Sequence, residues 1–547
     1  MGTNSQAKTG SLSSLPRQQV FWTVAGVMLA MFLSSLDQMI VGTAMPRIIS
    51  DLGGFNQYTW VTTAYIITSA VTVPIVGKLI DMYGRKSFYI AGIAIFVFFS
   101  LACGLSQTMT QIIFFRGAQG IGAGIMMANA FTVIADLFPP AERGKYQGYL
   151  SGLFGISSVI GPTLGGFLTD SLSWHWVFFV NVPLGIIVIL MFIRFFPNIR
   201  LDNLKHKVDF AGVTGLILTV VPALIALSWG GVEYPWASPE IIGMFVFSAV
   251  MLAAFLIIES RAREPILPLS LFRNNIVSVS WLAIFLSSIG MFGCITFVPL
   301  FFQGVKGASA TASGNYLIPM TMGIISGSII SGQILSRAGG HYRTQGIVGL
   351  TIMIVGLGLL SRIMFDSSYW TIALFTIVTG FGLGITLPLY TIAVQNAVPH
   401  NMLGVATGSS AFFRSIGGSV GLAILGSVMN NRFAADLATM MPDSVKSVVP
   451  QAQLAALAHN PQALVNPQAQ AQLQSALSQF GPQGQTLLGQ IMLSLREALA
   501  SAIAECFLIA MLVIIVALVV TIFIKEIPLR KQHQGPTPGP KPVTETT

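Results

Sequence analysis

The sequence predicts an all-α integral membrane protein with fourteen membrane-crossing helices. Of its 547 residues, 53% are hydrophobic and only 9% are charged, and the mean hydropathy is +0.75. The apolar residues are gathered in runs of about 20, the length that a helix needs to cross the hydrocarbon core of a bilayer. The net charge of +9 comes from loops between these runs, which argues against a nucleic-acid-binding face.

Read in order along the chain, the apolar runs give fourteen candidate spans. They are expected near residues 20–43, 58–79, 87–105, 111–136, 145–169, 175–196, 210–229, 239–259, 276–302, 312–336, 344–364, 370–396, 404–429 and 500–524. An even number of crossings places both termini on one side of the membrane. Of the 28 Lys and Arg residues, twenty fall in the loops, tails and adjoining span ends of that side, six on the other side and two deep within spans. This bias predicts that both termini are cytoplasmic.

Three further features fit this layout. The first nineteen residues are polar, and the following apolar run has no small-residue cleavage site, so it is expected to remain as the first helix. Cys103, Cys294 and Cys506 lie within apolar runs without metal or redox spacing and are expected to be small core residues. Segment 431–499 is rich in Ala, Gln and Pro and predicts an amphipathic, partly helical loop on the outer side.

The chain contains an internal repeat. A shift of 260 residues aligns GIGAGI at Gly120 with GFGLGI at Gly380, and the same shift pairs five further Gly and Pro positions between 139 and 166 with positions between 399 and 426. The repeat relates spans four and five to spans twelve and thirteen, so the two copies run parallel, as in transporters whose halves rock about a central site. The predicted organisation is a tail 1–19, a six-helix half 20–196, two inserted helices within 197–275, a six-helix half 276–524 that includes the outer loop 431–499, and a tail 525–547.

Charged residues inside the spans are the first candidates for function. Asp37 lies well inside the first span, where a carboxylate is costly unless it is paired or faces water. It is predicted to carry protons, with a structural hydrogen bond between helices as the alternative. Arg116 in span four needs an acceptor, for which Asp37 is a candidate; the alternative is a gating or packing role. Glu505 is either a second protonation site or a solvated residue, and Arg414 is either a structural partner or a functional group.

Two groups of uncharged residues complete the candidates. Span five carries small residues and a proline that permit close packing and bending, with plain packing as the simpler interpretation: Gly155, Gly161, Pro162, Gly165 and Gly166. Aromatic and amide side chains on several spans are predicted to line an apolar pocket with a few polar contacts. Packing against lipid or neighbouring helices is the alternative for each of them: Trp60, Tyr65, Asn129, Phe292, Phe297, Tyr390, Gln395, Phe412 and Phe413.

The motifs of several enzyme classes are missing from the sequence. It has no GxxxxGK[ST] for ATP-driven pumping, and its GxGxxG-like runs lie on apolar helices instead of following strands. HExxH and GxSxG are also missing, so the chain is not expected to be an enzyme. No cofactor or metal is predicted.

Several stretches together resemble the major facilitator superfamily. GKLIDMYGRK, between spans two and three, resembles the cytoplasmic loop signature of that family. FFRGAQGIGAG resembles its fourth-helix motif, GPTLGG its fifth-helix antiporter motif and LDQMIVGTAMP the first-helix signature of drug:proton antiporters. WHWVFFVNVPLG resembles a run of the fourteen-helix branch, and the likeness covers nearly the whole chain except the tails and the outer loop.

The resemblance implies roles for individual residues. Asp37 corresponds to the first-helix acid implicated in proton coupling and Arg116 to the fourth-helix arginine that takes part in proton transfer. The loop motif implies a latch whose charges pair in the outward-facing state and separate in the other, which biases a two-state equilibrium. Its members are Gly77, Asp81, Gly84, Arg85 and Lys86, with Asp136 completing it from the inner end of span four.

The sequence also departs from the family pattern. His175 stands where the branch usually has Arg, and the second-half counterpart of the loop, GQILSRAGGHYR from Gly332, lacks the acid of the first half. A second latch is therefore expected to be weaker. Arg414 occupies a helix in which some exporters of dicationic drugs carry an acid, and this weakens the case for divalent cationic substrates.

The sequence therefore predicts a major facilitator fold of two six-helix halves plus two inserted helices, in the cytoplasmic membrane of a prokaryote. The expected function is export of amphipathic, hydrophobic or cationic compounds in exchange for protons, driven by the proton gradient without a cofactor. The expected partners are small molecules, protons and the bilayer. In a cell with an outer membrane, a periplasmic adaptor could also bind the outer loop. The alternatives are a dedicated exporter of a lipid, siderophore or metabolite, and a membrane sensor that does not transport.

Overall fold

The computed structural model describes residues 16–53, 57–197, 207–308, 316–337, 341–446 and 481–529. Within these ranges, fourteen helices are long and apolar enough to cross a membrane, which confirms the predicted number. Helices suit these runs because a bilayer offers no water to peptide groups, and a helix satisfies its own N–H and C=O groups internally.

The helices fall into three groups along the chain. The first half contains α1 Arg17–Leu52, α2 Tyr58–Tyr83, α3 Arg85–Gly104, α4 Met109–Leu137, α5 Pro140–Ser171, α6 Trp176–Phe179 and α7 Asn181–Phe195. The inserted group contains α8 Phe210–Trp229, α9 Pro239–Arg261 and the short η3 Leu269–Arg273. The second half contains α10 Asn275–Leu300, η4 Phe301–Val305, α12 Ile318–Arg337, α13 Tyr342–Leu360, α14 Tyr369–Ala397, η5 His400–Met402, α15 Leu403–Met440, α16 Asp443–Lys446 and α19 Gly481–Ile522.

The internal repeat reappears as matching helices. Helices α4 and α14 each have 29 residues, and both their first and last residues are 260 positions apart. Their N-caps are also matched, because the hydroxyl of Thr108 accepts a hydrogen bond from the backbone N–H of Gln111 and that of Ser368 accepts one from the N–H of Thr371. The 260-residue shift found from the glycines therefore relates two whole helices, including the N-cap residues at which they begin.

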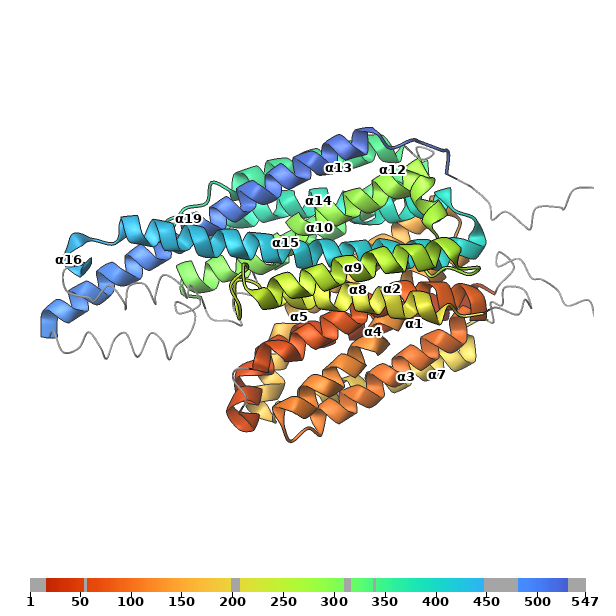
Figure 1. Cartoon of the computed structure of the whole chain (residues 1–547), viewed down its shortest axis with the longest axis horizontal. Helices are drawn as coiled ribbons and strands as arrows, with labels where there is room; N and C mark the ends of the chain where they lie inside the picture. Colours follow the sequence, from red (N-terminus) through yellow and green to blue (C-terminus); the bar gives the residue numbers. More distant parts are fainter. Residues whose placement is uncertain are drawn as a thin grey trace, which may run out of the picture.

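The two halves lie side by side, and the inserted helices border the line between them (Figure 1). The halves contact each other mainly through two helix pairs, α2 with α15 and α5 with α12. Helices α8 and α9 pack on each other, and α8 contacts α2 of the first half and α15 of the second. Both described chain ends lie at the end of the bundle where α2 meets α3 and where α15 begins.

Three helices extend furthest beyond the apolar runs that predict them. Helix α1 has 36 residues, α15 has 38 and α19 has 42. The last two continue into segment 431–499, and with α16 they project beyond the other helices at the end away from the termini (Figure 1). Leu437 of α15 and Ile491 and Leu495 of α19 are buried there in one apolar cluster. Residues 447–480 of the predicted loop lie outside the described ranges.

Candidate functional site

A buried polar cluster surrounds Asp37 in the middle of the first half. The side chain of Asp37 is 0% exposed. Arg116 of α4 donates from Nη1 to Oδ2 of Asp37 over 2.6 Å, and Gln119 of the same helix donates to Oδ1 over 3.1 Å. Asn181, at the start of α7, donates to Oδ1 over 2.7 Å. The carboxylate of Asp37 thus joins α1 to α4 and α7. It is also the acceptor that Arg116 needs, a pairing that the sequence alone leaves open.

Gln119 and Asn181 are absent from the residues predicted for this site. Gln119 follows Arg116 by three positions, so the two side chains share a helix face, and the Gln119 carbonyl oxygen also accepts from Arg116 over 2.9 Å. Asn181 is an amide within an apolar stretch, and its Nδ2 also donates to Ser100 over 2.9 Å. A search for every amide inside a span, in addition to every charge, would have found both residues.

One side chain connects this cluster to the space between the halves. The guanidinium carbon of Arg116 lies 4.2 Å from the ring centre of Tyr65, a cation–π contact, and the Tyr65 hydroxyl lies 3.3 Å from Oγ of Ser34. Tyr65, Ser34 and Gln38 line the central cavity, whereas the Asp37 carboxylate does not. The side chain of Tyr65 therefore connects the Asp37–Arg116 ion pair to the cavity wall.

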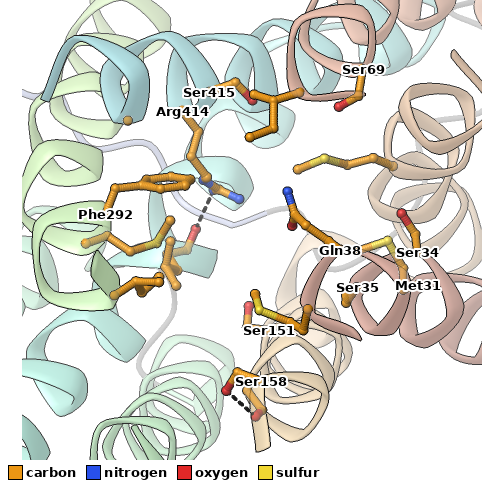
Figure 2. A pocket seen from close by; sticks show the side chains of 18 of the residues that line it. Met31, Ser34, Ser35, Gln38, Ser69, Ser151, Ser158, Phe292, Arg414 and Ser415 are labelled. Atoms are coloured by element: carbon orange, nitrogen blue, oxygen red, sulfur yellow. Dashed lines mark hydrogen bonds between the residues drawn. The ribbon is translucent and has the colours of Figure 1, made fainter. Parts of the chain in front are cut away.

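The central cavity has a volume of about 230 Å³ and lies between the halves. Helices α1, α2, α4 and α5 line it from one side and α10, α12, α14 and α15 from the other. Its polar lining is mainly hydroxyl and amide groups, several of which are seen in Figure 2: Ser34, Ser35, Gln38, Ser69, Ser151, Ser158, Thr321, Ser415 and Ser419, with Arg414 as the cation. Its apolar lining contains flexible methionines, which adapt to differently shaped ligands: Met31, Met39, Met127, Met291 and Met320.

Of the predicted pocket residues, Tyr65 and Phe292 line this cavity and seven others do not. Trp60 instead packs edge-on against Trp229 of α8, and Phe413 stacks on Trp281 of α10. The remaining five are held by other neighbours. Gln395 contacts Gln147 and Arg143 of α5, Tyr390 bonds Thr521 of α19, Asn129 bonds a carbonyl within α4, Phe412 is in an apolar cluster, and Phe297 lines a second cavity.

That second cavity has a volume of about 590 Å³ and is bordered by α2, α8, α10 and α15. Ile66, Ser419 and Leu422 line both cavities. On α15 the second cavity reaches as far as Asn430, whereas the central cavity begins at Arg414, nearer the start of the helix. The two cavities thus share part of a wall, and the second lies nearer the end of the bundle away from both described termini.

At the opposite end, the loop motif forms a buried charge cluster. Arg85, which is 0% exposed, bridges two carboxylates, with Nη1 lying 2.8 Å from Oδ1 of Asp81 and Nε 2.8 Å from Oδ2 of Asp136. His400 of the second half lies 3.6 Å from the other oxygen of Asp136. Lys86 differs, because its ammonium group donates to the carbonyls of Ile193 and Phe196 at the end of α7, within the first half.

Asp81 links this charge cluster to the second half. Its two carboxylate oxygens accept hydrogen bonds from the backbone N–H groups of Gly404 at 3.0 Å and Val405 at 2.9 Å. These groups open α15, where unpaired N–H groups and the helix dipole favour an anion. Gly77 permits the approach, since a Cβ there would lie 2.6 Å from the Gly404 carbonyl oxygen, and Gly84 has a φ of +96° that favours glycine.

The repeat places a second crossing opposite the first. A Cβ on Gly144 of α5 would lie 2.6 Å from Cα of Gly332 in α12. Gly144 and Gly404 are partners under the 260-residue shift, so each half presents a glycine to the other. The side chains of residues 336–340, where the second-half counterpart of the acid would fall, lie outside the described set, so the prediction of a weaker second latch stays a prediction.

The small residues of α5 pack against two helices. A Cβ at Gly161 would lie 2.5 Å from Cβ of Met39 in α1, and one at Gly165 would lie 2.8 Å from the Ile40 carbonyl oxygen. A Cβ at Gly155 would overlap Thr321 of α12, whereas one at Gly166 would meet nothing within 4 Å in the described chain. Pro162 lies inside the helix.

This difference gives a matched pair of substitutions. We expect Gly161→Ala to lower the free energy of unfolding of the purified protein by about 1–3 kcal/mol, because the added methyl group overpacks the contact with α1. We expect Gly166→Ala to leave stability unchanged or slightly raised, since alanine favours a helix more than glycine does. Melting in detergent, followed by size exclusion, measures both; equal losses in the two variants would contradict the packing argument.

Glu505 does not contact the Asp37 cluster. Its carboxylate lies 2.9 Å from Nε of Arg432 in α15, and the Glu505 side chain is 36% exposed. Arg432 also pairs with Asp436 one turn further along α15. Glu505 therefore helps to join α15 to α19 in the second half.

Comparison with known proteins agrees with this fold. The family model of the Major Facilitator Superfamily matches residues 27–422. The multidrug transporter protein MdtP of Bacillus subtilis is 41% identical over 516 residues, which cover 92% of this chain and 93% of that protein. Multidrug resistance protein 3 of the same species is 36% identical, with 92% and 94% covered.

A solved structure extends the comparison to the fold. The human organic anion transporter MFSD10 aligns with 91% of this chain and 100% of its own, with a TM-score of 0.58 and 13% identity. At that identity the likeness concerns the fold alone. Together with the family match and the bacterial relatives, the fourteen helices, the paired halves and the cavity between them identify this chain as a multi-pass membrane transporter, not an enzyme, that belongs to the major facilitator superfamily.

Proposed function

We propose that this chain is a drug efflux transporter that exports amphipathic small molecules in exchange for protons. The observation that carries the proposal is a carboxylate buried at the centre of the first half, Asp37, paired with Arg116 and separated by Tyr65 from the mostly apolar central cavity. A carboxylate inside a membrane is a functional group by default, and a cavity with few polar groups suits varied organic ligands. Similarity to two bacterial proteins named for multidrug transport or resistance supports the same function.

We further propose an orientation in the cytoplasmic membrane. The positive-inside bias assigns the latch end, with both termini, to the cytoplasm. In that orientation the described conformation is closed inward, by the bonds from Asp81 to α15, and its cavities extend outward.

The pairing of Asp37 suggests how protons drive the cycle. In the outward-open state, a proton from outside neutralises Asp37 and removes the counter-ion of Arg116, which weakens the hydrogen bonds that tie α1 to α4. A group bonded differently in two states shifts the balance between them, so protonation favours the inward-open state. There the proton leaves to the cytoplasm, substrate enters, and the restored ion pair favours the outward-open state again.

Energised everted membrane vesicles test this function. We expect the wild-type protein to accumulate ethidium or other amphipathic dyes in the vesicles, and we expect a protonophore to abolish the accumulation, because uptake depends on the proton gradient. Vesicles without the protein are the control. Dye uptake that persists after the gradient has collapsed would contradict proton coupling, and a folded protein that moves no dye would direct the search to a dedicated lipid or metabolite exporter.

A further inference from the structure

The central cavity contains one cationic side chain, Arg414 of α15, and no carboxylate among the described residues that line it. Figure 2 shows Arg414 reaching into the cavity, with its guanidinium group turned toward the amide of Gln38 on the opposite wall. The other polar lining groups are neutral hydroxyls and amides. The wall that meets a substrate is therefore positive.

The guanidinium group of Arg414 has few hydrogen-bond partners. It carries five N–H donors, and its two recorded bonds, from Nη2 to the Leu387 carbonyl oxygen and to Oγ1 of Thr391, are both 3.5 Å long, the upper limit for such a bond. Its Nε is buried and has no partner in the described part of the chain. A small space behind it, bordered by Ser287 and Ser288, measures about 10 Å³, room for about one water molecule.

Several acids in the described helices pair with other arginines. Asp37 pairs with Arg116, and Asp81 and Asp136 pair with Arg85. Glu505 and Asp436 pair with Arg432. Arg414 differs from these three arginines in having no protein carboxylate within ion-pair distance in the described structure. An arginine in a membrane interior is costly without an acceptor, and planar carboxylates and sulfonates match its donors well.

We propose that Arg414 is the substrate-anion contact of the central cavity, so that this transporter prefers amphipathic molecules with one anionic group. The inference rests on the proposed function and narrows its substrate class. The methionine-rich wall takes the apolar body of the substrate, and Arg414 pairs with its carboxylate, sulfonate or phosphate. A cationic amphipath has no counter-charge in this cavity and meets Arg414 at close range, so it is the poorer substrate.

The test compares two dyes of opposite charge in proteoliposomes with an imposed proton gradient. The anionic probe is 1-anilinonaphthalene-8-sulfonate and the cationic probe is ethidium. We expect Arg414→Gln to lower kcat/KM for the anionic dye about tenfold or more, because a charge-assisted bond is lost, and not to lower it for ethidium. Arg414→Lys keeps the positive charge and is expected to retain most transport of the anionic dye.

The matched control is Arg362→Gln, which removes an exposed arginine in the turn after α13 and is expected to change the transport of neither dye. Size exclusion in detergent checks that each variant is folded. If Arg414→Gln lowers both dyes equally, or leaves the anionic dye unchanged, or if the wild type moves ethidium but not the anionic dye, the inference is overturned while the proposed function stands. If the wild type moves neither dye in response to the gradient, both fail.

Discussion

Asp37→Asn is expected to abolish proton-coupled export. Asparagine has the shape of aspartate and can accept the hydrogen bonds of Gln119 and Asn181, but it cannot take up a proton. Dye accumulation in energised vesicles should fall to the level of vesicles without the protein. A variant that still exports dye with unchanged dependence on the gradient would remove Asp37 from the mechanism.

The same substitution leaves the buried Arg116 without its counter-ion, so stability has to be separated from coupling. Removing one partner of a buried ion pair costs about 3–5 kcal/mol, and we expect Asp37→Asn to melt at a lower temperature while it remains monodisperse. The double variant Asp37→Asn/Arg116→Gln replaces the pair by two neutral groups and should recover much of that loss. Its transport should stay absent, which would assign the defect to the lost proton site and not to instability.

Arg85→Ala is expected to open the latch. The substitution leaves the carboxylates of Asp81 and Asp136 buried together without a cation, at a cost of several kcal/mol in the closed-latch conformation only. A cost of 1.4 kcal/mol already shifts a two-state equilibrium about tenfold, so this conformation should lose most of its population. Transport should fall by more than tenfold, because one state of the cycle becomes rare.

Spin labels at the far end of the bundle report this shift. Gln107 in the first half and Met440 in the second are exposed, and the three native cysteines are buried, so two introduced cysteines label selectively. The distance between the labels should shorten in Arg85→Ala, since the far end closes when the latch end opens. Lys86→Ala removes a neighbouring charge whose contacts stay within the first half and should leave the distance unchanged. A shortened distance in the control would show that any lost loop charge has this effect.

The number of helices and the repeat could be predicted because both depend on features that can be read directly from the sequence. Apolar length defines a span, and glycines recur where two backbones cross, as at Gly144 and Gly404. Asp37 and Arg116 stood out because charges inside spans are costly. That the two residues pair with each other is seen only in the structure.

The cavity lining was harder to predict for a physical reason. In a bilayer, lipid and protein interior are equally apolar, so the face of a helix that meets a cavity resembles the face that meets lipid. Phe413 and Phe292 are indistinguishable by residue type, yet Phe413 stacks on Trp281 and Phe292 lines the cavity. The ends of α15 and α19 beyond the predicted spans were expected only as part of a partly helical loop, because the polar residues that continue these helices carry no hydropathy signal.

The length of α19 has a mechanical consequence. At 1.5 Å per residue its 42 residues span roughly 63 Å, about twice the thickness of the hydrocarbon core. Together with α15 and α16 it forms an arm that projects from the second half, so in the proposed transport cycle a rocking of that half by a few degrees would sweep the tip through several ångströms. In that cycle the tip of the arm would move farther than the helices at the membrane centre, so an antibody fragment bound to the tip is expected to hold the transporter in one state.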